Sequence, residues 1–401
     1  MTARNDTHLT RQNLKELHLK QIFLCARNQR GGISRAELTK ILNLSFPSVS
    51  ALVDELLEAG VLMETGQQES NYHGRPRNLL QVVPDFLYFP VFELKRRCYR
   101  FVLYDVYGKI LRDEFLPFNR PADKMQEVWF PGLEEICNPL TDCINSLQRE
   151  FPLADIVLSL PGNIRRDGHF SSSSSQIVSP LGFLDCLEEK TEHRVLPINR
   201  SDCFAYGERA DNSNLDDYIY LYISDGIGAG IIRDGQIFTC GPWRAGEVGH
   251  MSVDYQGRPC TCGSRGCLER YLNVDAIVAD CAALVPGENW DFPTVCQAYA
   301  NGDPEIEALL EAKAELLCAA INNMFTLHPI SHVIIGGEIT RLGDKFLSCL
   351  KRHMEKRTSS MYRGKTALTF SKNQGESSTR GAFQNYVNNI LNLNAFYKKE
   401  G

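Results

Sequence analysis

The chain has 401 residues, more than a single hydrophobic core usually organises, so two or three folding units are expected. It is 43% hydrophobic and 23% charged, as is typical of soluble globular proteins. No run of about 18 apolar residues predicts a membrane-spanning helix, and the polar N-terminus lacks the apolar segment of a signal peptide. We therefore expect a cytoplasmic protein without a membrane partner.

Charge is spread unevenly along the chain. Residues 1–85 carry ten Lys/Arg and nine Asp/Glu, a net charge of +1; because the whole chain carries −6, −7 remains for the other residues. This asymmetry permits an N-terminal contact with a polyanion and argues against nucleic-acid binding by the rest. Eleven of the 14 cysteines are scattered in mostly apolar contexts, which is typical of free thiols in a reducing compartment.

Three helices are predicted before residue 60. The first covers residues 13–27, and its apolar stripe is expected at Leu14, Leu17, Ile22 and Cys25. The second begins at Ser34, because Ser34 followed by Glu37 is a capping box. The third begins at Ser45 and has Pro47 in its first turn, where a missing N–H costs little.

The third helix predicts a DNA-reading surface. One face has apolar residues at helical spacing and is expected to be buried: Val49, Leu52, Val53, Leu56 and Leu57. The opposite face begins with Phe46, Ser48 and Ser50 and carries no acid there. Short donors away from negative charge suit a helix that enters the major groove. We include Arg35 of the preceding helix among the candidate DNA contacts.

A two-stranded wing is predicted next. Residues 61–65 and 78–83 read as strands, and the polar tip between them holds Arg75 and Arg77 in the segment "GRPR". Its proline favours an extended chain that presents both guanidinium groups to phosphates or to a minor groove. Residues 1–84 are therefore predicted to form a winged helix–turn–helix DNA-binding domain. The alternative is a small helical domain that contacts proteins.

Strands and helices alternate after Pro84, which favours an α/β architecture of two lobes with a cleft between them. "ADIVLSLPGNI" reads as a buried strand and a turn, and "DDYIYLYISDGIGAGIIRDGQI" as two strands around a glycine turn. We expect a first lobe over residues 85–198, completed by a C-terminal helix over 380–397. The second lobe is expected over 199–379, with a cysteine-rich loop and an oligomerisation surface.

A possible metal site lies in "GEVGHMSVDYQGRPCTCGSRGCLERY", residues 246–271. The candidate ligands are His250, Cys260, Cys262 and Cys267. One imidazole and three thiolates make a closed tetrahedral set suited to Zn²⁺, and four protein ligands leave no open position for catalysis. Gly263 and Gly266 allow tight turns between the ligands. The alternatives are three unpaired thiols on a flexible loop, or a redox pair.

The motifs "LPGNI", "ISDGIGAGII", "AGEVGH", "CTCGSRGCLE" and "VIIGGEI", behind a winged N-terminus, resemble the ROK family of repressors, open reading frames and sugar kinases. The resemblance covers about residues 13–390, and the cysteine segment is its most specific motif. It implies an actin-like, ribonuclease-H-like sugar kinase fold. Family members with a winged helix in front are sugar-responsive transcription factors, whereas members without it are usually kinases.

The resemblance also implies effector-binding residues. In the family, the glutamate of E-x-G-H, the histidine itself and the glutamate after G-C-L face sugar hydroxyls, which assigns Glu247, His250 and Glu269 to an effector pocket. His250 can bind zinc through one ring nitrogen and offer the other to a ligand. The alternative is that both glutamates are solvated loop residues.

Two features of the family's kinases are altered here. The ATP-binding glycine loop corresponds to "FELKRRCYRF", where Glu93 takes the acid position and bulky residues 95–97 replace small ones. The family pattern N-D-x-N matches Asn199, but Arg200 takes the place of the catalytic aspartate, and a guanidinium is no general base. Asp202 aligns with the later asparagine and substitutes for the base only after a local shift. We therefore expect no kinase activity.

Arg200 leaves the chemical class of the effector undecided. An arginine suits a carboxylate or phosphate, which predicts a sugar acid or phosphosugar beside Asn199 and Arg200. Alternatively, Arg200 pairs with Asp202 or a glutamate and no effector binds. The sequence thus predicts a repressor of carbohydrate genes, active as a homodimer or tetramer on double-stranded DNA and controlled by a sugar or sugar derivative. A divergent kinase and a regulator controlled by a partner protein are the alternatives.

Overall fold

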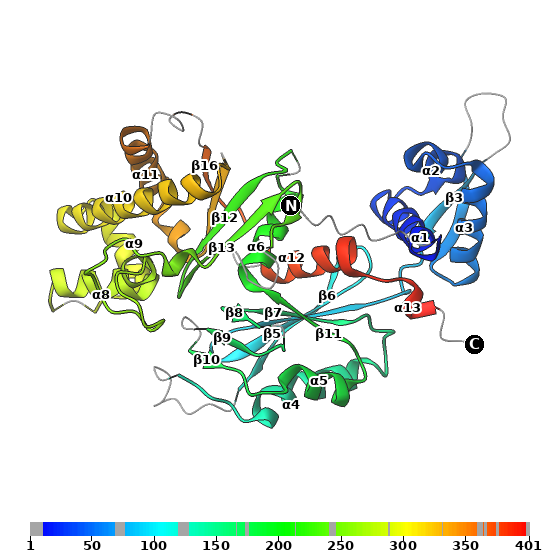
Figure 1. Cartoon of the computed structure of the whole chain (residues 1–401), viewed down its shortest axis with the longest axis horizontal. Coiled ribbons are helices and arrows are strands. Elements are labelled where there is room, and N and C mark those ends of the chain that lie inside the picture. The colour runs from blue at the N-terminus through cyan, green and yellow to red at the C-terminus, as the bar shows by residue number, and fades with distance from the viewer. Residues whose placement is uncertain are drawn as a thin grey trace, which may run out of the picture.

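The structure is a computed structural model. It describes residues 11–68, 77–118, 128–165, 167–172, 176–212, 214–239, 246–287, 289–330, 332–358, 364, 367–373 and 377–397. Figure 1 shows an N-terminal unit beside the first of two α/β lobes. Among these residues, no helix has both the length and the apolar character needed to cross a bilayer.

The N-terminal unit is a winged helix. Its elements are α1 (Arg11–Asn28), β1 (Ile33–Ser34), α2 (Arg35–Leu42), α3 (Phe46–Glu58), β2 (Leu62–Gln68) and β3 (Arg77–Val82), with the strands in the order β1-β3-β2. The predicted caps are confirmed: Ser34 and Glu37 form the capping box of α2, and Ser45 caps α3. Val49, Val53 and Leu56 are the buried part of the expected α3 face.

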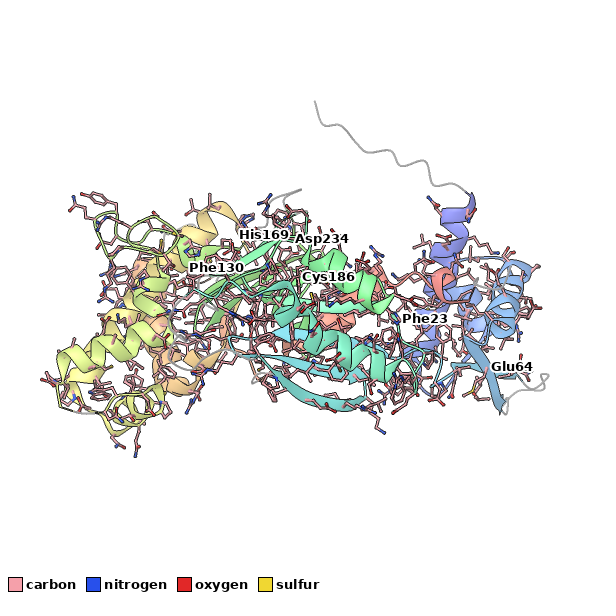
Figure 2. The ribbon with its side chains drawn as sticks, turned by 90° about the horizontal axis from the view of Figure 1, so that it is seen from below. Phe23, Glu64, Phe130, His169, Cys186 and Asp234 are labelled. Carbon is pink, nitrogen blue, oxygen red and sulfur yellow. The ribbon has the colours of Figure 1, made fainter. Side chains whose placement is uncertain are left out.

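The predicted apolar stripe of α1 is partly wrong. Leu14 and Leu17 are 40% and 44% exposed, whereas Leu19, Ile22, Phe23 and Ala26 are buried. Both stripes fit a helical period, and tertiary packing decides between them. The buried stripe joins a core that includes residues of the first lobe, and Figure 2 shows Phe23 on the side of the winged unit that faces this lobe.

The two lobes repeat one sheet topology. The first sheet has the order β11-β7-β4-β5-β6, from β4 (Phe89–Leu94), β5 (Cys98–Tyr104), β6 (Ile110–Pro117), β7 (Ile156–Leu160) and β11 (Val195–Asn199). The second has the order β14-β13-β12-β15-β16, from β12 (Tyr218–Ile223), β13 (Ile227–Arg233), β14 (Gln236–Ile237), β15 (His332–Gly336) and β16 (Ala367–Phe370). In each, three antiparallel strands are followed by two strands parallel to the first.

Helices cover both sheets. In the first lobe these are α4 (Leu133–Leu147) and α5 (Phe183–Thr191), next to a small sheet of β8 (Asn163–Ile164), β9 (Phe170–Ser172) and β10 (Ile177–Val178). In the second lobe they are α7 (Glu269–Leu272), α8 (Val274–Leu284), α9 (Phe292–Asn301), α10 (Pro304–Leu327) and α11 (Gly343–Arg357). Each lobe therefore has its own apolar core.

Two helices cross between the lobes. α6 (Arg200–Gly207) follows the first sheet but packs mainly on β12 and β13, whereas α12 (Ser377–Asn385) follows the second sheet and packs on β4 and β7. They make the most extensive contact of any two elements in the described chain, and α12 lies between the lobes in Figure 1. A Cβ on Gly381 would lie 1.8 Å from the Cys203 carbonyl oxygen, so only glycine allows this approach.

The C-terminal segment differs from the single helix expected over 380–397. α12 begins at Ser377 and ends at Asn385, a π-helical turn covers Tyr386–Ile390, and α13 (Asn394–Tyr397) follows a break. Phe383 and Tyr386 of this segment share a core with residues of the winged unit and the first lobe. The winged unit and the first lobe therefore have separate sheets on either side of residue 84, but they share one apolar core.

Candidate effector cavity, metal centre and DNA-binding surface

A cavity of about 350 Å³ lies between the lobes. The first lobe contributes residues 161–163, 171–172 and Asn199; the second contributes residues 226–228, Glu247, His250 and Glu269; Arg200 and Ser201 come from the start of α6. All five expected effector residues thus line one cavity. Its volume and its place between two lobes are those expected of a small-molecule site.

Asn199 positions the start of α6. Its side-chain oxygen accepts a hydrogen bond from the Ser201 N–H at 2.7 Å, which caps the helix, and its Nδ2 donates to the Gly162 carbonyl at 2.6 Å. One side chain therefore ties the "LPGNI" turn to the helix that crosses between the lobes.

Arg200 has a partner that the sequence did not identify. Its Nη2 lies 3.6 Å from Oδ1 of Asp225, in the turn between β12 and β13, and its guanidinium lies 5.3 Å from the ring centre of Tyr222. Burial lowers the pKa of Arg200, but the charge of Asp225 and its neighbours outweighs this and raises it. Arg200 is therefore a charged side chain, 7% exposed, whose charge is balanced from the second lobe.

Glu269 is not a solvated loop residue, as one alternative held. It is 6% exposed at the start of α7, and its Oε2 accepts a hydrogen bond from the Ile227 N–H at 3.0 Å. Glu247 is half-buried beside the short helix that carries His250. Two carboxylates, Glu247 and Glu269, therefore line the cavity together with Arg200, and Asp225 lies beside Arg200. The acids outnumber the single guanidinium.

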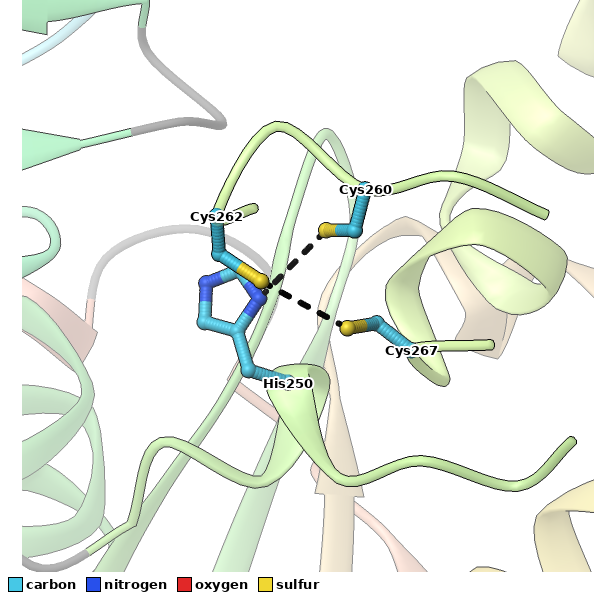
Figure 3. A group of neighbouring side chains, drawn as sticks. All are labelled: His250, Cys260, Cys262 and Cys267. Atoms are coloured by element: carbon cyan, nitrogen blue, oxygen red, sulfur yellow. Dashed lines mark hydrogen bonds between the residues drawn. The ribbon is translucent and has the colours of Figure 1, made fainter. Parts of the chain in front are cut away.

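The four predicted ligands come together as expected (Figure 3). Their ligand atoms lie within 4.8 Å of one another; Cys260 Sγ is 3.7 Å from His250 Nδ1, and Cys262 Sγ is 3.6 Å from Cys267 Sγ. Gly263 and Gly266 both have positive φ, which explains the two glycines of the motif. The cluster is a set of donors that could bind a metal.

The thiols of this cluster favour a cation. Burial, together with the neighbouring thiols of Cys260 and Cys262, raises the pKa of Cys267 to about 12. Burial also raises the pKa of Cys262, but hydrogen bonds from Ser264 and the other two thiols outweigh it and lower that pKa. Three thiolates this close together repel one another, and a divalent ion removes that repulsion.

The predicted DNA-contacting residues differ in exposure. Phe46 is 54% exposed and Ser48 is exposed at the start of α3, whereas Ser50 is half-buried. Arg35 is engaged within the unit, since it donates to Asp54 at 2.9 Å and to Glu64 at 2.8 Å; Figure 2 shows Glu64 at the outer side of the winged unit. Arg75 and the side chain of Arg77 lie outside the described residues.

A family model described as the ROK family matches residues 98–387. The chain belongs to the ROK family. Among similar proteins, the xylose repressor of Caldicellulosiruptor bescii is 26% identical over 81% of this chain and 84% of its own. The DNA-binding transcriptional dual regulator NagC of Escherichia coli is 28% identical over 80% of each chain.

Solved structures of ROK proteins confirm the expected fold. A ROK family transcriptional regulator, described as a homolog of the E. coli MLC protein, matches with a TM-score of 0.81 at 23% identity over 96% of this chain and 99% of its own. The ROK hexokinase from Thermus thermophilus matches with a TM-score of 0.62 at 21% identity over 74% of this chain and 96% of its own. The fold is a winged helix–turn–helix followed by a two-lobed, actin-like domain.

Several residues in or beside the cavity were missed from the sequence. Asp225 lies beside Arg200, the Arg200 guanidinium lies over the ring of Tyr222, and Ser171 and Ser172 form part of the cavity wall. The dipeptide "SD" before the glycine turn was a usable signal for Asp225, because acids at strand ends often face a cleft. The serines carried no such signal.

Proposed function

We propose that this ROK protein is a DNA-binding transcriptional repressor of carbohydrate genes, released from its operator by a neutral sugar or sugar derivative. The observation that carries the proposal is that one chain joins an exposed winged helix to a polar interlobe cavity. Relatives similar over 81% and 80% of this chain are named xylose repressor and N-acetylglucosamine repressor, which supports the same role here.

The charges in the cavity favour an uncharged effector. Asp225 balances Arg200, and the carboxylates of Glu247 and Glu269 then leave a negative cavity that repels phosphates and sugar acids. Carboxylates, Asn199 and the ring of His250 are good partners for sugar hydroxyls. We therefore favour a neutral sugar over the anionic effector that Arg200 alone suggests.

Zn²⁺ fits the donor set of His250, Cys260, Cys262 and Cys267. When bound, it would supply structural order and no catalysis, since four protein ligands leave it no open position. His250 directs Nδ1 toward the thiols and lines the effector cavity as well. The loop that holds Glu247 and Glu269 in reach of an effector would thereby be fixed.

A packed path connects the cavity to the winged unit. α6 begins in the cavity at Arg200 and packs on α12, whose Phe383 lies under the guanidinium of Arg27 in α1 at 5.4 Å. The same Arg27 donates from Nε to the Val106 carbonyl at 2.6 Å. We propose that lobe closure moves α6 and α12 together and re-orients α1, which changes the spacing of two winged units in a dimer or tetramer.

In this account the protein does not phosphorylate sugars. Arg200, in the position of the catalytic aspartate, cannot accept a proton, and its pair with Asp225 holds it in place. Lys95 lies in the turn after β4, where a kinase needs small residues near ATP. Its Nζ is 3.5 Å from Oε2 of the buried Glu93 in β4. Incubation with ATP and neutral sugars tests this directly, and formation of a sugar phosphate would contradict it.

DNA selection followed by binding measurements tests the proposed function. DNA sites enriched from a random library by the purified, zinc-loaded protein are expected to contain two half-sites about one helical turn or more apart. Phe46 and Ser48 are expected to face bases, and Arg75 and Arg77 phosphates or a minor groove. Enrichment of no sequence at moderate salt would contradict the proposal.

A further inference from the structure

The second lobe carries another group of metal-ligating side chains, away from the His250 cluster in sequence and on different elements. α10 and α11 pack against each other (Figure 1), and Glu311 on α10 faces Cys349 and His353 on α11. The ligand atoms of these three residues lie within 4.8 Å of one another. The four-residue spacing places Cys349 and His353 one turn apart on a single face of α11.

His353 has an unsatisfied ring nitrogen. Its side chain is 12% exposed, and its Nε2 lies 3.4 Å from Glu311 Oε1, yet this buried nitrogen makes no hydrogen bond with any part of the chain that the structure describes. Cys349 is 6% exposed beside it. A buried nitrogen without a hydrogen bond is costly, and coordination to a metal would satisfy it.

On either side of this group, α10 and α11 are joined by ion pairs, without a thiol or an imidazole. Lys345 pairs with Glu307 one turn before, and Arg357 pairs with Glu315 one turn after. Glu311 has an equivalent ion pair with Arg352 at 2.8 Å, so the helices are already joined at this level. The Cys349 thiol accepts a hydrogen bond from Arg352 at 3.4 Å, and the His353 imidazole lies beside Glu311, so both groups contact this ion pair. Together with Glu311 they also complete a set of metal ligands.

We propose that Glu311, Cys349 and His353 form a second site, for a divalent transition metal, with Zn²⁺ the preferred ion. One thiolate, one imidazole and one carboxylate suit Zn²⁺ and exclude Mg²⁺ and Ca²⁺, which prefer oxygen ligands. Glu311 is 53% exposed on its side chain, so a fourth position is open to water. Arg352 competes for Glu311, and its half-exposed side chain can turn into solvent when the ion binds.

Zinc titration of the full-length protein against a micromolar chromophoric chelator tests the site. Wild type is expected to take up two zinc ions per chain, and His353→Gln and Cys349→Ser one each. The matched control Cys262→Ser should lose the other ion, so failure of this site and failure of the His250 cluster give different patterns. Arg352→Gln removes the competitor and should tighten the second site roughly two- to fivefold, the worth of one exposed ion pair.

Cobalt substitution provides a readout that does not depend on stoichiometry alone. In the Cys262→Ser background, Co²⁺ at the second site should give a thiolate-to-metal absorption that Cys349→Ser abolishes and Glu311→Gln weakens. The proposal is overturned if wild type and the α11 variants all bind one zinc, or if the cobalt spectrum is unchanged by Cys349→Ser. Because Glu311 is exposed, its variant is expected to fold normally.

Discussion

Arg200 lies in the effector cavity with a charge that Asp225 already balances. Without that partner, the single guanidinium would favour a sugar acid or a phosphosugar. With it, the surrounding carboxylates determine the charge of the cavity, and a neutral ligand is expected. Arg200 Nη2 and Asp225 Oδ1 are 3.6 Å apart, and the Asp225 side chain is a third exposed, so the pair contributes little to the free energy of unfolding. Its role is best tested by removing one charge and measuring ligand binding.

Asp225→Asn is expected to change which sugars bind. In wild type, xylose, glucose or N-acetylglucosamine should raise the melting temperature, and gluconate or glucose 6-phosphate should not. In the variant, Arg200 is unpaired, so the anionic sugars should gain at least tenfold in affinity, about 1.4 kcal/mol. Ligand titrations followed by thermal unfolding measure both.

Asp217→Asn is the control, because Asp217 lies at a similar distance, 3.8 Å, from Arg233 in an exposed pair outside the cavity. It should leave the ligand profile of wild type unchanged. Binding of anionic sugars to wild type, or an unchanged profile in Asp225→Asn, would contradict the role given to this pair.

Cys262→Ser is expected to remove one zinc ion per chain and to weaken sugar binding roughly tenfold or more, because the loop that positions His250 and Glu269 loses its order. Metal analysis and isothermal titration with the effector sugar measure the two effects. Cys186→Ser, a half-buried thiol in the first lobe, is the control and should change neither. Normal sugar affinity in a zinc-free Cys262→Ser protein would show that the metal does not order the effector cavity.

Arg35 is expected to support DNA binding indirectly, by holding Asp54 and Glu64 away from phosphates. Arg35→Met should lower DNA affinity about three- to tenfold, with a stability loss below about 1 kcal/mol because the pairs are exposed. Adding Asp54→Asn and Glu64→Gln should recover most of the affinity. If Arg35 contacts a phosphate instead, the neutral variants will recover nothing and the salt slope will fall by about one. Fluorescence anisotropy at several salt concentrations distinguishes the two.

At the scale of single residues, the sequence predicted the contacts between residues that lie close together in the chain. The four residues of the His250 cluster lie within one short segment, and the structure brings them together as expected. Asp225 was missed because its proximity to Arg200 depends on how α6 crosses to the second sheet, which no local pattern contains. Arg35 was predicted to contact DNA, and its ion pairs with Asp54 and Glu64 were missed. These two acids lie on other elements, 19 and 29 residues away.

Among the elements, α6 and α12 link the lobes. Gly381→Ala would place a Cβ 1.8 Å from the Cys203 carbonyl oxygen, so the helices must separate. We expect a loss of about 1–3 kcal/mol in the free energy of unfolding, the usual cost of overpacking. Gly31→Ala, at an open turn with no atom within 4 Å of the added Cβ, should be nearly neutral. Urea denaturation of both variants measures this, and equal stability would contradict close packing at Gly381.

The three helices and the two longer strands of the winged unit could be predicted from the sequence, because caps and apolar periods are local. The C-terminal helix was predicted too long, since the π-helical turn at Tyr386–Ile390 and the break after it result from packing against α1 and the first sheet. The same long-range contacts selected Leu19 and Phe23, rather than Leu14 and Leu17, as the buried side of α1.

For the whole molecule, the shared core of the winged unit and the first lobe is the central feature. Arg27 of α1 and Arg30 in the turn after α1 donate to the backbone carbonyls of Val106 and Tyr107 in the β5–β6 turn, and the Tyr107 hydroxyl donates to the Val82 carbonyl. A winged unit fixed in this way moves with the first lobe. A change in lobe closure is therefore a change in the position of the DNA-binding helix.

The most direct test of the account is the dissociation constant for a selected DNA site, measured by fluorescence anisotropy at fixed salt with and without a saturating neutral sugar that raises the melting temperature. If the cavity controls the winged unit, the complex with DNA should be at least tenfold weaker in the presence of the sugar, a coupling of about 1.4 kcal/mol. An unchanged DNA affinity, with the sugar demonstrably bound, would contradict the claim that the cavity controls the winged unit.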